Sequence, residues 1–191
     1  GTYTLRTSRN RTLTFDGTGR LTGIRERGKG ITLQYINTGD NPTRIVDSVG
    51  RLITLSYSTD NARLERLTLA DGRYVEYGYS QDAARRLVSV RDRDGKTRTF
   101  GYDPVHKYLE SEHDRRGNRV FFNEYDASGR AIRQTDAKAG VTTFAWDEPT
   151  QTMTITDPSG ARVARRTWFT SWCQAREVND QRGWRSSQQM T

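Results

Sequence analysis

An aromatic residue, Phe, Tyr or Trp, occurs at a nearly constant interval along most of this 191-residue sequence. The successive steps are 20, 22, 22, 23, 23, 21 and 22 residues. The members, called the ladder aromatics below, are Phe15, Tyr35, Tyr57, Tyr79, Tyr102, Tyr125, Trp146 and Trp168. A fixed period of this size indicates one supersecondary unit copied along the chain. Such a repeat array is typical of a surface, a scaffold or a container more than of an enzyme.

Each unit is predicted to contain two turns that open with Asp and close with Gly. Asp at the first turn position caps the following amides, and Gly supplies the positive φ that closes a short hairpin loop. The second turn recurs most regularly, with the pairs Asp47 and Gly50, Asp92 and Gly95, Asp114 and Gly117, Asp136 and Gly140, Asp157 and Gly160, and Asp180 and Gly183. After three ladder tyrosines, Ile36, Ser58 and Ser80 replace Asp, and a turn cap is expected to be lost there.

Apolar and polar residues alternate between the turns. Ile53, Leu55 and Tyr57 fall on one face of an extended strand, and no stretch of useful length carries a helical stripe. Period-two alternation bounded by Asp and Gly turns predicts antiparallel hairpins. We therefore predict an all-β fold of repeated antiparallel β-hairpins that forms part of a spiral β-sheet shell.

The repeats are predicted to form one continuous array without a linker. Residues 1–14 read as an irregular leading hairpin, residues 15–168 as seven hairpin repeats, and residues 169–191 as an incomplete eighth repeat. The arms of the leading hairpin are expected at residues 3–5 and 12–14. Both ends read as cuts through a longer protein, so the chain is expected to be a fragment.

Composition limits the function classes. The net charge is +8, and 27 of the 31 basic residues are Arg, but no basic run accompanies this charge. We expect the arginines to pair with turn Asp or to lie on solvated faces, and we expect no nucleic-acid partner. The 19 aromatic residues argue against disorder. Cys173 is the single cysteine, so an internal disulfide is excluded, and no membrane segment is present in the sequence.

The pattern Tyr-Asp-x-x-Gly-Arg followed by Asp-x-x-Gly resembles the YD repeat of Rhs (rearrangement hotspot) proteins. Its best copies are Phe15–Leu21, Val46–Leu52 and Tyr125–Arg130, and the resemblance covers nearly the whole chain. It implies a large β-hairpin shell. In bacterial Rhs proteins and the C subunits of insecticidal toxin complexes such a shell encloses a variable C-terminal toxin, and teneurins carry a related shell for adhesion. The arginine content and the lack of cysteine pairs favour the bacterial branch.

The resemblance implies a structural, non-enzymatic segment of a shell that encapsulates and helps deliver a C-terminal toxin in bacterial competition or pathogenesis. The expected partners are the remainder of the shell and its toxin cargo, with secretion-machinery proteins or surface glycans as further candidates. No cofactor or metal is expected. The implied location is secreted or on the bacterial cell surface, after synthesis in the cytoplasm. The alternative is an extracellular glycan-binding or adhesion surface built from the same repeats.

The Rhs resemblance also suggests a test for self-cleavage, because Rhs shells often end in two Asp-Pro-x-Gly-Leu boxes that supply an aspartyl pair. Boxes that begin at Asp157 and Asp180 have the family spacing, with 18 residues between them. They depart from the family at Ala161, Gln181 and Trp184. The repeat period alone produces this spacing, so we expect no proteolytic site here.

Other candidate site residues carry weaker signals. His106 and His113 have no Ser or Cys in a recognisable nucleophile motif, and we interpret them as polar surface. Trp172 and Trp184 do not match the interval of the ladder aromatics and are candidates for a binding or cargo-facing surface.

Overall fold

The computed structural model describes residues 1–8, 10–36, 39–150, 152–166, 177–180 and 185–187. Strands and turns, with no helix, make up this part of the chain. Two compact units divide the chain, residues 1–97 and 98–191. The predicted all-β fold of repeated antiparallel hairpins is confirmed.

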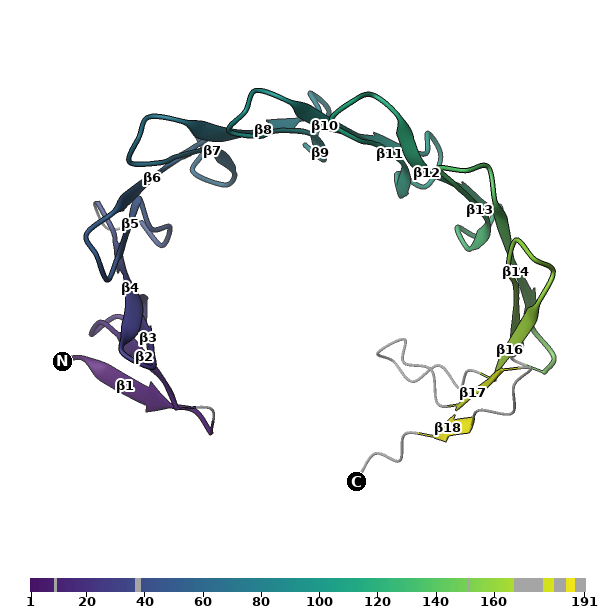
Figure 1. Ribbon diagram of the computed structural model, residues 1–191, viewed down its shortest axis with the longest axis horizontal. Helices are drawn as coiled ribbons and strands as arrows, with labels where there is room; N and C mark the ends of the chain where they lie inside the picture. Colours follow the sequence, from purple (N-terminus) through teal and green to yellow (C-terminus); the bar gives the residue numbers. More distant parts are fainter. Residues whose placement is uncertain (9, 37–38, 151, 167–176, 181–184, 188–191) are drawn as a thin grey trace. The chain divides into compact units, whose positions relative to one another are not determined.

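The first unit is an antiparallel meander in which each strand pairs with the next in chain order (Figure 1). Its strands are β1 (Tyr3–Arg6), β2 (Arg11–Phe15), β3 (Leu21–Glu26), β4 (Lys29–Gln34), β5 (Arg44–Asp47), β6 (Leu52–Tyr57), β7 (Leu64–Thr68), β8 (Tyr74–Tyr79) and β9 (Leu87–Arg91). In the leading hairpin, β1 and β2 place Leu5 opposite Leu13.

The second unit repeats the same connectivity. Its strands are β10 (Thr97–Tyr102), β11 (Leu109–His113), β12 (Arg119–Tyr125), β13 (Ala131–Asp136), β14 (Val141–Asp147), β15 (Thr152–Thr156), β16 (Arg162–Arg166), β17 (Glu177–Asp180) and β18 (Arg185–Ser187). The repeat boundaries at residues 14 and 168 stay predictions.

The Asp-to-Gly turns close the hairpins by a repeated set of bonds. In the turn after β5, the Asp47 amide donates to the Arg51 carbonyl (3.1 Å), and the Gly50 amide donates to the Asp47 carbonyl (3.0 Å). Gly50 has a φ of 82°, which a residue without a Cβ adopts at little cost. The turns that begin at Asp16, Asp92, Asp114, Asp126 and Asp157 make the same pair of bonds.

A β-bulge accompanies most ladder aromatics. The pairing register shifts by one residue directly before the aromatic, and the next strand carries the extra residue. The aromatic is thereby paired with the first residue of the following strand. The pairs are Phe15 with Leu21, Tyr57 with Leu64, Tyr79 with Leu87, Tyr102 with Leu109 and Tyr125 with Ala131.

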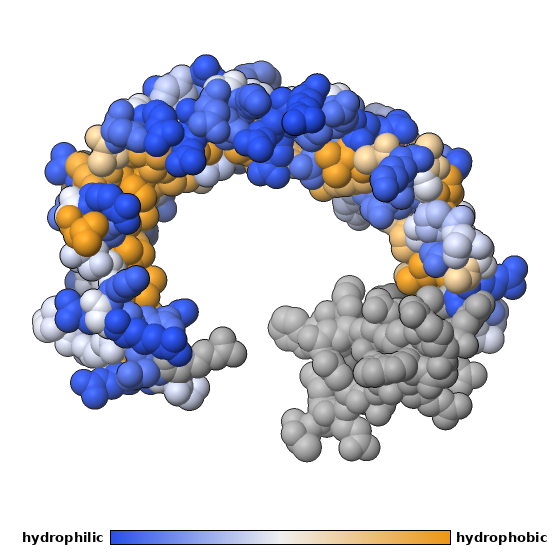
Figure 2. Space-filling view, in the orientation of Figure 1, coloured by the Kyte–Doolittle hydropathy of each residue, from blue (hydrophilic) through white to orange (hydrophobic). Residues whose placement is uncertain are grey.

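The first unit is one strand layer thick and has two chemically different faces. Cross-strand neighbours define an apolar face from Leu5, Leu13, Ile24, Ile31, Leu33, Ile45, Ile53, Leu55, Leu67, Val75, Tyr77 and Val90. Figure 2 shows hydrophobic side chains (orange) gathered beside hydrophilic ones (blue) over β3 to β6. Among the described apolar residues, Leu55 alone is buried, with 8% of its surface exposed. Because no second layer covers the sheet, interactions between neighbouring hairpins must hold it together.

Candidate functional surface: the junctions between hairpins

Four ladder tyrosines tie successive hairpins together through their side-chain hydroxyls. Each hydroxyl donates to a backbone carbonyl 14 to 16 residues earlier in the chain. The bonds run from Tyr35 to Leu21 (2.8 Å), Tyr57 to Pro42 (2.8 Å), Tyr79 to Leu64 (2.8 Å) and Tyr125 to Leu109 (2.6 Å). The ladder therefore makes a specific bond at each of these junctions, in addition to apolar contact.

A residue at the start of the odd-numbered strand links one ladder aromatic to the next. Leu64 pairs with Tyr57 across the bulge, and its carbonyl accepts the hydroxyl of Tyr79. Leu21 links Phe15 to Tyr35, and Leu109 links Tyr102 to Tyr125, in the same way. We call Leu21, Leu64 and Leu109 the relay leucines. They were not predicted from the sequence, although each is the first residue of the strand that follows the first turn.

The residue before the relay position covers the next ladder aromatic. The guanidinium carbon of Arg20 lies 5.0 Å from the ring centre of Tyr35, and that of Arg63 lies 6.0 Å from Tyr79. Arg130 lies 5.7 Å from Trp146. Cations at these distances are attracted to the face of an aromatic ring.

Burial favours the protonated, hydrogen-bond-donating form of the Tyr57 and Tyr79 hydroxyls by raising the pKa of each. Desolvation raises the pKa of Tyr57, with a smaller contribution from Tyr35. Desolvation also raises the pKa of Tyr79, helped by Tyr77. Both phenols therefore stay protonated well above neutral pH and can serve as hydrogen-bond donors.

The turn aspartates act as caps. The Asp47 carboxylate accepts the amides of Val49 and Arg51, both at 2.9 Å. The amide and then the side chain of Arg51 hold the pKa of Asp47 below its ordinary value. The pKa values of Asp16, Asp60, Asp71, Asp82 and Asp114 are also lowered, in each case first by a side-chain hydrogen bond. These carboxylates therefore accept hydrogen bonds within their own turns.

Many turn arginines pair with these aspartates, as the sequence predicted. Arg20 lies 3.0 Å from Asp16, and Arg51 lies 2.6 Å from Asp47. Arg86 forms an ion pair with Asp82. Exposed pairs of this kind add at most about 1 kcal/mol each, so their main effect is to fix the turn geometry.

The expected loss of a cap after Tyr57 and Tyr79 is wrong. The Ser58 hydroxyl accepts the Arg63 amide at 3.1 Å, and the Ser80 hydroxyl accepts the Arg86 amide at 2.8 Å. A serine oxygen accepts amide hydrogen bonds as a carboxylate does, so the turn remains capped.

The prediction that Gly140 closes its turn through positive φ is also wrong. Ala139 has the positive φ there (63°), and its amide donates to the Asp136 carbonyl. A Cβ on Gly140 would lie 2.6 Å from a carboxylate oxygen of Asp136. Glycine is therefore required at this position by close approach of the side chain.

His106 is packed into a junction and is not the polar surface residue that was expected. Its ring stacks on Tyr108 with 5.7 Å between ring centres, and its Nε2 lies 3.3 Å from the Ala127 carbonyl oxygen. Its buried Nδ1 lies 3.5 Å from Asp103 and forms no hydrogen bond. Burial alone would raise the pKa of Asp103. The hydrogen bonds from the amides of Val105 and His106 act in the opposite direction and help to outweigh it, so the pKa of Asp103 lies below its ordinary value.

The remaining predicted residues separate into two groups. Asp92, Asp114 and Asp157 open turns, with Gly95, Gly117 and Gly160 at positive φ. The Asp157 carboxylate accepts the amides of Ser159 and Ala161. Asp180 is the last residue of β17. Trp168, Gly183, Trp172, Trp184 and Cys173 lie outside the described residues.

No group of three or more His, Cys, Asp or Glu among the described residues could hold a metal ion. No helix in the described part is long and apolar enough to cross a membrane.

The family model described as RHS Repeat matches residues 125–162. This segment is similar to an RHS repeat. It begins at ladder residue Tyr125 and includes the Tyr-Asp-x-x-Gly-Arg pattern, so the resemblance to the Rhs/YD-repeat family is confirmed. No curated protein sequence matches the chain.

A solved structure shares the fold of this chain. A chain in the crystal structure of TcdB2-TccC3 matches with a TM-score of 0.58 and 12% identity, over 97% of this chain and 13% of that one. Two further matches are a TcdB2-TccC3-TEV crystal structure (TM-score 0.45, 15% identity, 94% and 11% covered) and the Photorhabdus luminescens Tc holotoxin pore (TM-score 0.39, 12% identity, 94% and 14% covered). The present chain therefore spans about an eighth of the length of the first matched chain.

Proposed function

We propose that this chain is a length of wall in an Rhs-type shell that encloses a toxin cargo and acts without catalysis. The observation that carries the proposal is the junction bond from ladder tyrosine to upstream carbonyl, repeated at four places. It joins hairpins side by side in a sheet one layer thick. The wall of a shell needs each hairpin to be bonded to the next, and these bonds provide that.

The two faces of the first unit support the same proposal. The apolar face leaves large side chains uncovered, including Tyr3 with 62% and Leu5 with 53% of their surface exposed. An enclosed polypeptide would contact such a surface without needing a specific sequence. The turn aspartates and arginines are occupied with one another, which suits a structural role at both edges of the sheet. The proposed partners are the rest of the shell and the cargo, and the proposed location is secreted or on the cell surface.

The experiment uses the protein that contains this chain. Its intact mass is measured under native and denaturing conditions, with protease added to the native sample. We expect a C-terminal fragment that stays bound and protease-resistant until the shell is denatured. A variant with Tyr79→Ala and Tyr125→Ala should admit protease to the cargo, and the matched Tyr→Phe pair should admit less. A cargo that is digested equally fast in the native wild type would contradict the proposal.

A further inference from the structure

The polar face of the first unit carries a row of arginines with one on each odd-numbered strand. Cross-strand register places Arg6, Arg25, Arg44, Arg66 and Arg91 on the face opposite the apolar one. All five are exposed. We call this surface the arginine face. Alternate strands of a sheet lie about 9 to 10 Å apart, so the charges are regularly spaced.

The arginine face has an excess of positive charge. The strand register places Glu76 on it, where it forms an ion pair with Arg66 at 2.6 Å. Arg91 donates to the Tyr74 hydroxyl at 2.6 Å. Within the described residues, Arg6, Arg25 and Arg44 form no ion pair. Arginines that are exposed and unpaired are available to an anionic partner.

A first hollow on this face lies over β2, β3 and β4. Its lining includes the hydroxyl-bearing residues Thr12, Thr14, Thr22 and Thr32, with Arg25 beside them. The floor is open because Gly30 has no side chain. A Cβ there would lie 2.6 Å from the Ile24 carbonyl oxygen. Asp47 also lines the hollow, but its carboxylate is held by Arg51.

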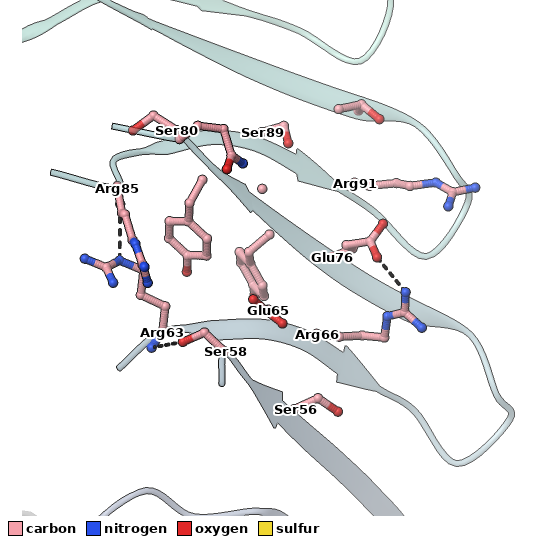
Figure 3. Close-up of a pocket in the computed structure, with 15 residues that line it drawn as sticks. Ser56, Ser58, Arg63, Glu65, Arg66, Glu76, Ser80, Arg85, Ser89 and Arg91 are labelled. Carbon is pink, nitrogen blue, oxygen red and sulfur yellow. Dashed lines mark hydrogen bonds and ion pairs between the residues drawn. The ribbon is translucent and has the colours of Figure 1, made fainter. Parts of the chain in front are cut away.

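A second hollow lies over β6 to β9 of the same unit. Ser56, Gly78 and Ser89 line its middle, and a Cβ on Gly78 would collide with the Ser89 hydroxyl. Figure 3 shows Arg66, Glu76 and Arg91 together at one end of this hollow and Ser58, Arg63 and Arg85 at the other. The lining holds four arginines and two glutamates, Glu65 and Glu76. Asp60, outside the lining, forms ion pairs with both Arg63 and Arg85, so an excess of one positive charge remains.

We propose that the arginine face binds an acidic polysaccharide. Hydroxyl-lined hollows can exchange hydrogen bonds with sugar hydroxyls, and guanidinium groups bind carboxylate or sulfate in a bidentate manner. Regular spacing along the face matches a polymer with one anionic group per short repeat. This inference does not depend on the proposed shell function, because it concerns a surface of the chain itself.

Two other polyanions fit the face less well. Single-stranded nucleic acid is bound through aromatic side chains that stack on bases. The register places Tyr74 here, and its ring is covered by Arg66 at 4.3 Å and Arg91 at 5.4 Å. Tyr77 and Tyr79 also line the second hollow, but the register places Tyr77 on the apolar face, and the Tyr79 hydroxyl is bonded to the Leu64 carbonyl. An anionic membrane surface is bound by basic residues together with apolar side chains that insert, and the large apolar surface of this unit lies on the opposite face.

The test measures binding of a heparin-derived octasaccharide to the full chain by calorimetry at several salt concentrations. We expect binding that weakens as salt rises, and no binding of a neutral dextran of the same length. The variant Arg25→Gln with Arg66→Gln should lose tenfold or more in affinity, and its salt slope should fall by about two. The control is Arg11→Gln, since Arg11 is paired with Glu26 on the apolar face. It should change affinity less than twofold.

Each alternative outcome overturns the proposal. These are no binding by the wild type, equal binding of dextran, an equal loss in the Arg11→Gln control, and tighter binding of oligo-dT or phosphatidylserine vesicles than of the octasaccharide. Circular dichroism and a urea midpoint within the error of the wild type show that the double variant is folded. The matched pair Arg44→Gln and Arg44→Lys gives a second reading, because lysine keeps the charge and loses the bidentate geometry.

Discussion

At the Tyr79 junction in the first unit, the tyrosine hydroxyl binds the Leu64 carbonyl, and Arg63 lies over the ring. At the Tyr125 junction in the second unit, the hydroxyl binds the Leu109 carbonyl, but the residue before the relay leucine is Tyr108. Its ring meets that of Tyr125 edge to face at 5.5 Å. The two junctions share the hydroxyl bond and differ in the side chain that covers the ring.

The Tyr125 junction also reaches the next turn. His106 and Tyr108 lie against the backbone at Gly129, where a Cβ would be 2.8 Å from Tyr108 and 3.1 Å from His106. The aromatic cover therefore demands glycine in the next turn, whereas the turn after Tyr79, whose ring is covered by Arg63, has Arg85 at positive φ. Covering by aromatic rings is the more restrictive solution.

The largest expected effect comes from removing a ladder ring. Tyr79→Ala should lower the free energy of unfolding by about 2 to 3 kcal/mol, because it loses a partly buried ring and the bond to Leu64. Urea denaturation measures the change. Tyr3→Ala is the control, since Tyr3 is 62% exposed, and it should cost less than about 0.5 kcal/mol. Equal losses in both would mean that the ladder does not tie the hairpins.

Gly129→Ala tests the extra reach of the Tyr125 junction. Gly117 and Gly129 have φ values of 84° and 78°, but a Cβ on Gly117 would have no neighbour within 4 Å. Gly117→Ala should therefore cost about 1 kcal/mol for backbone conformation alone. Gly129→Ala should cost at least about 1 kcal/mol more, because Tyr108 must move. Thermal or urea unfolding of the two variants gives the difference in the free energy of unfolding. Equal costs would show that the contact with His106 and Tyr108 does not restrict position 129.

Removing only the hydroxyl should cost more at the Tyr79 junction than at the Tyr125 junction. Tyr79→Phe is expected to cost about 1 kcal/mol, since it removes the side-chain donor to the Leu64 carbonyl. Tyr125→Phe should cost less, because the Leu109 carbonyl also accepts the side-chain amide of Asn123 at 3.0 Å. Urea midpoints of both variants provide the comparison. A cost for Tyr125→Phe that equals or exceeds that of Tyr79→Phe would show that the Asn123 amide does not support the Leu109 carbonyl.

The covering cation should have a smaller effect. Arg63→Gln is expected to cost about 0.5 kcal/mol, because the guanidinium is 6.0 Å from the Tyr79 ring centre and partly exposed. Arg27, in the tight turn between β3 and β4, is an exposed arginine away from any ladder ring, and Arg27→Gln serves as the control. A larger loss in the control would contradict the assigned contact.

The smallest effect is expected from a single turn cap, and it depends on pH. The pKa of Asp47 is lowered in the folded state, so its contribution is present above the ordinary value and is lost as pH falls through the lowered value. The difference in urea midpoint between the wild type and Asp47→Asn should therefore be constant near neutral pH and shrink below about pH 4. A difference that persists unchanged to about pH 2 would show that the charge is not involved.

Much of the fold could be predicted from the sequence because its signals are local. The regular interval of the ladder from Phe15 to Trp146 defines the length of one repeat. The Asp-to-Gly turns and the alternation at Ile53, Leu55 and Tyr57 are each read within a few residues. The strands and their order follow from these alone.

The junction chemistry could not be predicted in the same way. The bond from Tyr79 to Leu64 depends on the bulge, which shifts the register by one residue and has no residue type of its own. The cap at Ser58 was missed because a hydroxyl was read as a lost carboxylate. His106 was missed because its packing depends on Gly129 in the next hairpin. In each case the information lies in pairs of residues from different strands.

The ladder has a consequence for how such a chain can change in length. Ladder aromatics such as Tyr79 and Tyr125 lie on even-numbered strands, and their hydroxyls bind the carbonyl of the first residue of the strand before. Inserting one strand would move every later turn to the opposite edge of the sheet and would separate the tyrosine at that point from its carbonyl. Inserting a whole hairpin keeps the turns on their edges and the tyrosine beside its carbonyl. Gain and loss of repeats should therefore occur in steps of two strands, so that duplication or recombination of whole units is the change that this architecture tolerates.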